Sequence, residues 1–143
     1  MPTARTPPIY TSPQDVTQAF YQAFEARDLD AMMATWAEDE DIVCIHPSGV
    51  RHVGYEAVRQ SFEQMFASEG KVSFRIDGLV AIETVGLAMQ STIEHLRAGE
   101  NGPRGAAIAT NVLMRTPSGW RIVCHHASPT PAVTEAPVAG PLH

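Results

Sequence analysis

Two polar side chains stand where the chain could enclose a largely apolar cavity. His46 ends a predicted strand, because Pro47-Ser48-Gly49 directly after it favours a turn. Asn111 shares its face of a later predicted strand with alanines and a leucine. An imidazole can move a proton near neutral pH, and an uncharged amide can donate hydrogen bonds to a carbonyl oxygen. His46 as general base and Asn111 as oxyanion donor are therefore the predicted catalytic residues; the alternative is that each bonds only to local backbone.

The dipeptide His125-His126 could suggest a metal site, but its geometry argues otherwise. Adjacent strand residues point to opposite faces, so the two imidazoles cannot serve one ion, and no metal site is predicted. Alternation puts His125 on the same face as Arg121, toward the cavity, and a bulge in the strand would exchange the roles of the two histidines. Glu94, near a strand end, could add a polar group to the mouth of the cavity, but an exposed cross-strand pair is the expected arrangement.

Helices are predicted first along the chain. Residues 1–11 contain several prolines and no periodicity, which indicates a flexible arm. Ser12-Pro13 begins a helix whose apolar residues recur every three or four positions. Asp28 can cap a second helix that runs to Trp36, and a third helix is predicted over residues 55–67, with glycines on both sides.

Strands follow the helices. Alternation predicts strands over residues 72–77, 81–96, 105–116 and 120–127, and their short Gly- and Pro-containing links favour hairpins in an antiparallel meander. Helices first and strands last predict an α+β fold with one domain over residues 12–129. Residues 130–143 are rich in proline and alanine and are expected to form a loosely attached tail.

The last two strands show no plainly polar face. Trp120, Ile122, Val112 and Met114 would together form an unusually apolar surface if water covered it. We therefore expect a homodimer that packs through this face of the sheet.

Composition excludes several classes of protein. The 143 residues carry a net charge of −6 without a basic cluster, which argues against a nucleic-acid partner. No apolar run is long enough to cross a membrane, and Cys44 and Cys124 form no Cys-x-x-Cys, so a reducing, cytoplasmic setting is expected. The chain contains no Gly-rich phosphate loop, serine or cysteine nucleophile motif, or zincin motif, and no cofactor is predicted.

Several of these segments together resemble the NTF2-like superfamily, especially its SnoaL-like and ketosteroid-isomerase-like bacterial members. They are Asp28-Leu29-Asp30-Ala31, the turn after His46, Gly54 and the run from Gly119 to Val123. The end of the chain around His125-His126 is also similar to the association domain of calcium/calmodulin-dependent kinase II. The resemblance implies a cone, in which a strongly bent sheet wraps around three helices and holds a pocket in its mouth.

The resemblance also implies positions for a ligand site. The general base of ketosteroid isomerase falls on His46 and one oxyanion donor falls on Asn111, whereas the second donor falls on Phe20, which has none. The pocket would be lined by Phe20, Tyr21, Trp36, Val58, Phe62, Ala109, Val123 and His125.

Two hypotheses about function follow. One is a pocket for a small apolar or carbonyl-containing molecule, with cofactor-free proton transfer of the isomerase or dehydratase kind. The other is a non-catalytic ligand-binding or self-association module, which is favoured by the missing donor at Phe20 and by the expected absence of a buried carboxylic acid. Fold alone cannot separate them, since this superfamily contains both enzymes and scaffolds.

Overall fold

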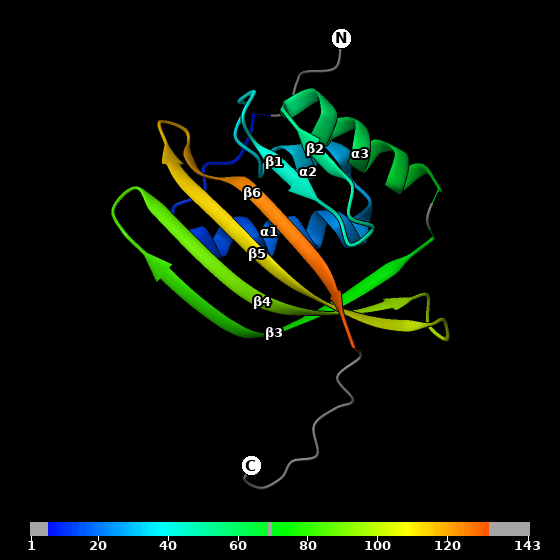
Figure 1. The fold of residues 1–143 in the computed structure, drawn as a ribbon. Helices are drawn as coiled ribbons and strands as arrows, with labels where there is room; N and C mark the ends of the chain where they lie inside the picture. The colour runs from blue at the N-terminus through cyan, green and yellow to red at the C-terminus, as the bar shows by residue number, and fades with distance from the viewer. Residues whose placement is uncertain (1–5, 69, 132–143) are drawn as a thin grey trace, which may run out of the picture.

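The chain folds into a curved sheet with helices packed on its concave side (Figure 1). The computed structural model describes residues 6–68 and 70–131. The elements in chain order are α1 (Pro13–Ala26), α2 (Leu29–Met33), β1 (Val43–Ile45), β2 (Arg51–Val53), α3 (Tyr55–Ser68), β3 (Val72–Glu83), β4 (Leu87–Ala98), β5 (Arg104–Thr116) and β6 (Gly119–Thr130).

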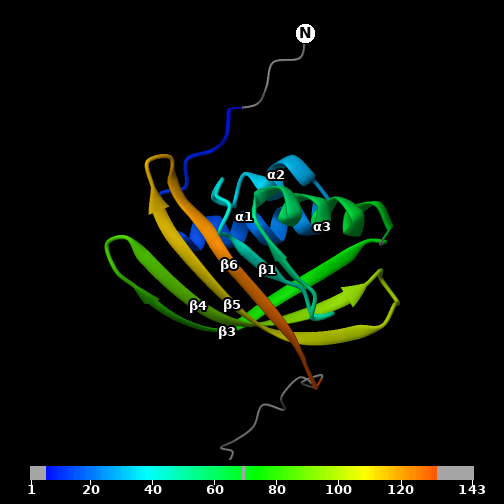
Figure 2. The ribbon, with the colours of Figure 1, turned by 45° about the horizontal axis from the view of Figure 1, so that its top comes forward.

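The six strands form one sheet in the order β2-β1-β6-β5-β4-β3. All neighbouring strands are antiparallel except β1 and β6, which are parallel. Helix α1 lies along the concave side of the long strands, with α2 and α3 beside β1 and β2 (Figures 1 and 2). The predicted α+β fold, with three helices held in a strongly curved and mostly antiparallel sheet, is confirmed.

Helix α1 begins and ends as its sequence dictates. The Ser12 hydroxyl accepts a hydrogen bond from the backbone N–H of Asp15, and Pro13 takes the first helical position. Arg27 then adopts the left-handed conformation, with φ of 53°, and its N–H bonds back to the carbonyls of the last turn. The helix thus has fixed ends, which sets the rotation of its buried stripe against the sheet.

Three predicted boundaries are wrong. The second helix ends at Met33 and not at Trp36, which forms an isolated bridge with Ile122. The segment from the His46 turn to α3 was expected to contain no strand, but Arg51–Val53 pairs back onto β1 as the short strand β2. The first long strand was expected to end at Asp77. It continues to Glu83 instead, because Gly78, at φ of 67°, forms a bulge between Asp77 and Val80 rather than a turn. The actual reversal lies between Glu83 and Leu87.

The predicted faces of β6 are wrong over half of its length. The register against β5 shifts by one residue after the pair Val112 and Cys124, so Leu113 faces Ile122 and the alternation is reset at Val123. As a consequence Trp120 and Ile122 are buried against the helices and do not contribute to the outer face. Arg121 therefore does not share a face with His125.

The core lies between the helices and the concave face of the sheet. Its largest fully buried side chains come from all three helices, the loop after α2 and three strands: Trp36, Phe20, Phe62, Met32, Ile42, Leu113, Ile122, Gln90 and Asn111. Phe62 alone contacts four other aromatic side chains and one imidazole, at ring centroid distances of 5.0–6.3 Å. Aromatic rings in such T-shaped and tilted contacts pack tightly, so side chains fill this end of the cone.

The described part of the predicted arm contacts the domain. Tyr10 pairs with Gly119 in a parallel bridge, and the Arg121 guanidinium lies 5.3 Å from the centre of the Tyr10 ring. Residues 1–5 of the arm and 132–143 of the tail lie outside the described residues. Among the described helices, none combines the length and apolarity needed to cross a membrane.

Candidate functional site

The strand register places three polar side chains in one row on the concave face. Gln90 of β4 pairs with Asn111 of β5, which pairs with His125 of β6. Thr92 and Glu94 follow on the same face of β4, since alternate strand residues share a face. All five side chains are buried. A curved sheet that is otherwise apolar on this side thus carries a polar strip across its centre.

A cavity of about 320 Å³ opens between this strip and helix α1. We call it the α1 cavity. Its lining residues are Gln14, Thr17, Gln18, Tyr21, Gln22 and Glu25 from α1, Phe74, Ile76 and Leu79 from β3, Gln90 and Thr92 from β4, and Asn111 from β5. The hydroxyl of Thr92 is buried, and no group of the described residues lies within hydrogen-bonding distance of it, although Thr92 is near enough to Tyr21 to lower its pKa. A bound molecule with a polar atom at this point would satisfy that hydroxyl.

Tyr21 connects the α1 cavity to a carboxyl group behind it. Its hydroxyl donates a 2.5 Å hydrogen bond to Glu94 Oε2, and both side chains are buried. Glu94 itself does not line the cavity. The predicted exposed position of Glu94 is therefore wrong, and so is the expectation that the fold lacks a buried carboxylic acid.

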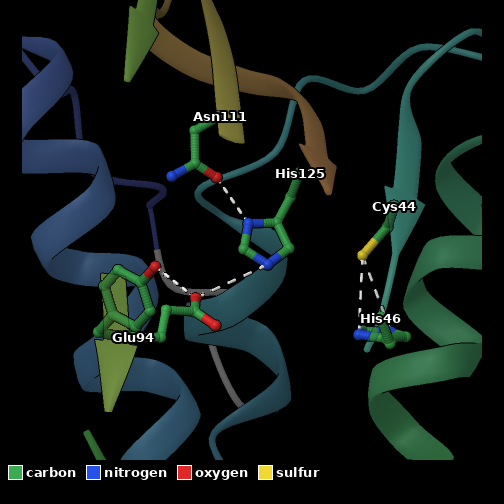
Figure 3. Close-up of polar contacts among 6 residues, drawn as sticks. Cys44, His46, Glu94, Asn111 and His125 are labelled. Carbon is green, nitrogen blue, oxygen red and sulfur yellow. Dashed lines mark hydrogen bonds and ion pairs between the residues drawn. The ribbon is translucent and has the colours of Figure 1, made fainter. Parts of the chain in front are cut away.

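His125 lies between Asn111 and Glu94 (Figure 3). Its Nδ1 is 2.6 Å from Asn111 Oδ1, and its Nε2 is 4.0 Å from Glu94 Oε2. In this arrangement Asn111 Oδ1 accepts the Nδ1 hydrogen, which leaves the Asn111 amide nitrogen for other partners. The Thr92 and Asn111 side chains each lower the pKa of Tyr21, against the larger opposing effects of burial and Glu94.

Burial disfavours the charged form of each of these groups. Desolvation raises the pKa of Glu94 to about 6, against a smaller lowering by the Tyr21 hydrogen bond. Desolvation also lowers the pKa of His125 to about 3, with help from His46 and His126. The pKa of Tyr21 is raised, mainly by burial and then by the Glu94 charge. Tyr21 and His125 are therefore neutral at neutral pH, whereas Glu94 is neutral only in mildly acidic solution, below about pH 6.

His46 lies in a different part of the core. The Ser61 hydroxyl donates to the backbone carbonyl of Val58 at 2.7 Å, so at 3.1 Å it accepts the hydrogen of His46 Nε2. Cys44 Sγ lies 3.7 Å from the same nitrogen, and burial followed by the effect of His52 lowers the pKa of His46 to about 4.

The structure does not bring His46 and Asn111 together. Figure 3 shows the His46 ring beside Cys44, apart from the group formed by Asn111, His125 and Glu94. A run of ring contacts separates the two histidines, from His46 through Phe62 and Phe20 to His125, with centroid distances of 5.0, 6.0 and 4.8 Å. His46 does not line the α1 cavity.

The residues predicted to line the pocket do not lie around one cavity. Tyr21 lines the α1 cavity, and His125 lies directly behind its lining residue Asn111. Phe20, Val58 and Phe62 are packed in the core, as is Ala109 in a small cluster with Ala107 and Ala127. Val123 is half-buried at the bulge, and Trp36 lines a second cavity.

This second cavity, of about 920 Å³, lies between the described part of the N-terminal arm and α2. Its lining residues include one positively charged side chain, Arg121, and three acidic ones, Asp30, Glu38 and Asp39. It shares no lining residue with the α1 cavity. Among the described residues no three His, Cys, Asp or Glu side chains cluster as metal ligands.

Sequence reasoning missed Gln90, Thr92 and Glu94. All three alternate with Met89, Ser91, Ile93 and His95 along β4, so the sequence shows polar residues on both faces and gives no sign of which face is buried. Phe20 itself has no hydrogen-bond donor, but the next residue, Tyr21, has one. The Tyr21 hydroxyl reaches the strip, while the Phe20 ring packs into the core.

Known proteins share the sequence pattern and the fold of this chain. The sequence profile of the SnoaL-like domain matches residues 14–132. The chain belongs to the SnoaL-like family. This SnoaL-like chain shares its fold with NTF2-like superfamily proteins, among them one from Salmonella enterica at 20% identity with a TM-score of 0.72, covering 88% of this chain and 93% of that one.

Two solved structures are more similar in sequence to this SnoaL-like chain. A Thiobacillus denitrificans protein assigned as a calcium/calmodulin-dependent protein kinase type II association domain is 40% identical, with a TM-score of 0.81, and the match covers 86% of this chain and 98% of that one. A Streptomyces avermitilis protein assigned as a dehydratase of the NTF2-like family is 27% identical, with a TM-score of 0.76 and coverage of 83% and 94%.

A plant protein also matches the SnoaL-like chain. The F-box protein SKIP8 of Arabidopsis thaliana is 29% identical over 113 residues, which are 79% of this chain. The match covers 47% of the plant protein, so the chain spans about half the length of that relative.

Proposed function

We propose that the α1 cavity binds a small, neutral and mostly apolar molecule through a carbonyl oxygen. The observation that carries this proposal is the unpartnered Thr92 hydroxyl, which is buried beside Asn111 in the cavity wall. The Asn111 amide nitrogen and the Thr92 hydroxyl can donate to the same oxygen, while Phe74, Ile76 and Leu79 supply apolar contact.

The charge of the cavity selects the ligand class. None of the described residues that line the cavity is positively charged, and among them only Glu25 is acidic. An anionic ligand would lose its hydration without gaining a counter-ion, which is costly in a buried site. A ketone or enone avoids this cost.

The chemistry that suits this site is proton transfer without a cofactor. Neutral Glu94 would pass its proton to the Tyr21 oxygen, reversing the 2.5 Å hydrogen bond, while Tyr21 gives its hydroxyl proton to the ligand's oxygen. The proton lost from the carbon next to the carbonyl would go to solvent. This proposal keeps Asn111 as a donor, assigns the acid role to Tyr21 and Glu94, and gives His46 no role, since His46 does not line the cavity. The similarity to an NTF2-like dehydratase supports the reaction class. Ligand binding without catalysis is the alternative.

The test is a binding comparison among three probes of similar size: 2-cyclohexenone, cyclohexene and cyclohexanecarboxylate. Side-chain amide signals of Gln90 and Asn111 would be followed by ¹H–¹⁵N NMR during titration. We expect the enone to shift both signals most strongly, and the variant Asn111→Leu to weaken its binding about tenfold through loss of a donor. Asn101→Leu, in the exposed β4–β5 loop, is the matched control. Preference for the carboxylate would contradict the proposal.

Self-association is a second candidate function, favoured by the outer face of the sheet. Cross-strand pairing aligns Ile82, Met89, Val112 and Cys124 in one row of this face, and Ile93 with Ile108 in another. Val80, Ile82, Ile108 and Met114 are each at least 45% exposed. An apolar sheet face of this kind is typical of a protein interface. The similarity to an association domain supports a homodimer formed by two copies of this face.

Sedimentation equilibrium tests this second candidate. The wild-type chain is expected to be a dimer, and the double variant Ile82→Glu with Ile108→Glu a folded monomer, because each protomer would bury two unpaired charges in the interface. Val85→Glu is the matched control, since Val85 is 84% exposed in the β3–β4 turn, outside the two rows. A monomeric wild type, or a double variant that remains dimeric, would refute it.

A further inference from the structure

The hydrogen bond between His125 and Asn111 fixes which nitrogen of the imidazole carries hydrogen. Asn111 Oδ1 is an acceptor at 2.6 Å, so Nδ1 carries the hydrogen. A neutral imidazole has one N–H, and therefore Nε2 presents a lone pair. This lone pair faces Glu94 Oε2 at 4.0 Å. Two lone pairs in a buried site repel, unless the carboxyl group of Glu94 is protonated.

Ionisation of Glu94 would favour the opposite arrangement. A carboxylate prefers a donor, so the imidazole hydrogen would lie on Nε2 and point at Glu94. Nδ1 would then carry a lone pair and accept a hydrogen bond. The Asn111 amide group would have to rotate by half a turn, so that its nitrogen and not its oxygen faces Nδ1. The balance is simple, because Glu94 releases one proton to solvent while His125 stays neutral and only changes tautomer.

We propose that His125 transmits the protonation state of Glu94 to the α1 cavity by determining which atom of the Asn111 amide faces the ligand. With neutral Glu94 the amide nitrogen faces the cavity and the site takes hydrogen-bond acceptors such as ketones. With ionised Glu94 the amide oxygen faces the cavity and the site takes donors such as alcohols. This regulation rests on the proposed function, in which Asn111 contacts the ligand.

Other titratable groups around Glu94 keep their charge over the relevant range. Tyr21 faces Glu94 from α1 and His125 faces it from β6. The charge of Glu94 also contributes to the raised pKa of Cys44 on β1. Burial raises the pKa of both Tyr21 and Cys44 and lowers that of His125 to about 3. The cross-strand neighbours of Glu94 are Ile76 and Ala107, which do not titrate.

Two other histidines influence His125. His46 has its pKa lowered to about 4, and the exposed His126 side chain lies on the opposite face of β6 from His125. Between pH 5 and pH 8 the buried group that changes charge is therefore Glu94, whose pKa is about 6. A switch of the His125 tautomer in this interval would report on Glu94.

The experiment reads the tautomer directly and needs no ligand. Long-range ¹H–¹⁵N NMR of the full chain, labelled with ¹⁵N-histidine, distinguishes hydrogen on Nδ1 from hydrogen on Nε2. We expect the His125 hydrogen on Nδ1 at pH 5 and on Nε2 at pH 8. In Glu94→Gln the side-chain amide can donate to Nε2 at every pH, so the hydrogen should stay on Nδ1. Glu83→Gln, an exposed residue at the end of β3, is the control and should behave like wild type.

A binding arm separates this inference from the proposed function. The affinity of the wild type for 2-cyclohexenone is expected to fall about tenfold from pH 5 to pH 8, since one donor is lost. A wild-type His125 tautomer that is the same at both pH values overturns the inference, even if the enone binds. If the tautomer switches but the enone does not bind, the linkage between Glu94 and Asn111 stands and the ligand assignment fails. Because the wild type alone gives the decisive titration, the result does not depend on the folding of Glu94→Gln.

Discussion

Tyr21 of helix α1 and Glu94 of strand β4 form a 2.5 Å hydrogen bond across 73 positions of sequence. It is a buried contact that ties the first helix to the centre of the sheet. It also connects the wall of the α1 cavity to a carboxyl group behind that wall, because Tyr21 lines the cavity and Glu94 does not. Its energetic role can be measured separately from any ligand.

Removing the Tyr21 hydroxyl is expected to destabilise the fold. In Tyr21→Phe the buried Glu94 loses its donor, which costs about 1–3 kcal/mol of unfolding free energy. The hydrogen bond lowers the pKa of Glu94, so the variant should also titrate Glu94 at higher pH. Urea denaturation and ¹³C NMR of the glutamate carboxyl carbons measure the two effects. Tyr55→Phe, at a half-buried tyrosine outside the α1 cavity, should change neither; a Tyr21→Phe variant as stable as wild type would contradict the assigned role.

Stability is expected to fall on acidification from about pH 6.5 to pH 4. The pKa values of His46 and His125 are lowered to about 4 and about 3, so the unfolded chain binds more protons in this interval. Each histidine then contributes a slope of up to about 1.4 kcal/mol per pH unit, with stability rising as pH rises. Glu94 acts with opposite sign between about pH 4.5 and pH 6, because its folded pKa is raised, and offsets part of that slope.

Replacing one buried histidine tests this pH dependence. His46→Gln should reduce the slope of unfolding free energy against pH between pH 4 and pH 6.5, measured by urea denaturation at several pH values. His126→Gln, at an exposed position on the outer face of β6, should leave the slope as in wild type. An unchanged slope in His46→Gln would mean that His46 is not held neutral by the fold.

The aromatic cluster around Phe62 should carry much of the stability. Phe62→Ala removes a fully buried ring and is expected to cost about 3–5 kcal/mol, whereas Phe62→Leu should cost less because it leaves a smaller void. The same pair tests the location of the ligand site. Since Phe62 does not line the α1 cavity, Phe62→Leu should leave the affinity for 2-cyclohexenone unchanged. Weaker binding in this variant would favour a pocket deeper in the cone.

Gly119 is expected to be intolerant of a side chain. Its φ is 101°, and a Cβ atom there would lie 2.7 Å from the carbonyl oxygen of Tyr10. Gly119→Ala should therefore lower the unfolding free energy by about 1–3 kcal/mol, through backbone strain and loss of the Tyr10 bridge. Gly86→Ala is the control, because its added Cβ would meet open space at an ordinary backbone angle. Equal melting temperatures for the two variants would show that the Tyr10 contact contributes nothing.

Local chemistry in the sequence determined the elements and much of the topology. The cap at Ser12, the loops at 99–103 and 116–119, and the alternation around Asn111 each depend on a few neighbouring residues. Such signals survive folding because caps, turns and strand faces are set by backbone geometry over short distances. Asn111, which alternation placed on one face with alanines and a leucine, is buried on the concave side and lines the α1 cavity.

Only the tertiary structure decided which polar groups meet. The bulge at Val123 reversed the faces of Trp120 and Ile122, and alternation cannot reveal such a shift because it depends on pairing with β5. His46 and Asn111 both end up buried, yet aromatic rings separate them, and Asn111 meets His125 and Glu94 instead. The sequence shows three polar residues on β4 without showing which face the helices cover. The packing of α1 against the sheet made that choice and brought Tyr21 to Glu94, because burying its apolar stripe fixed the rotation of the helix.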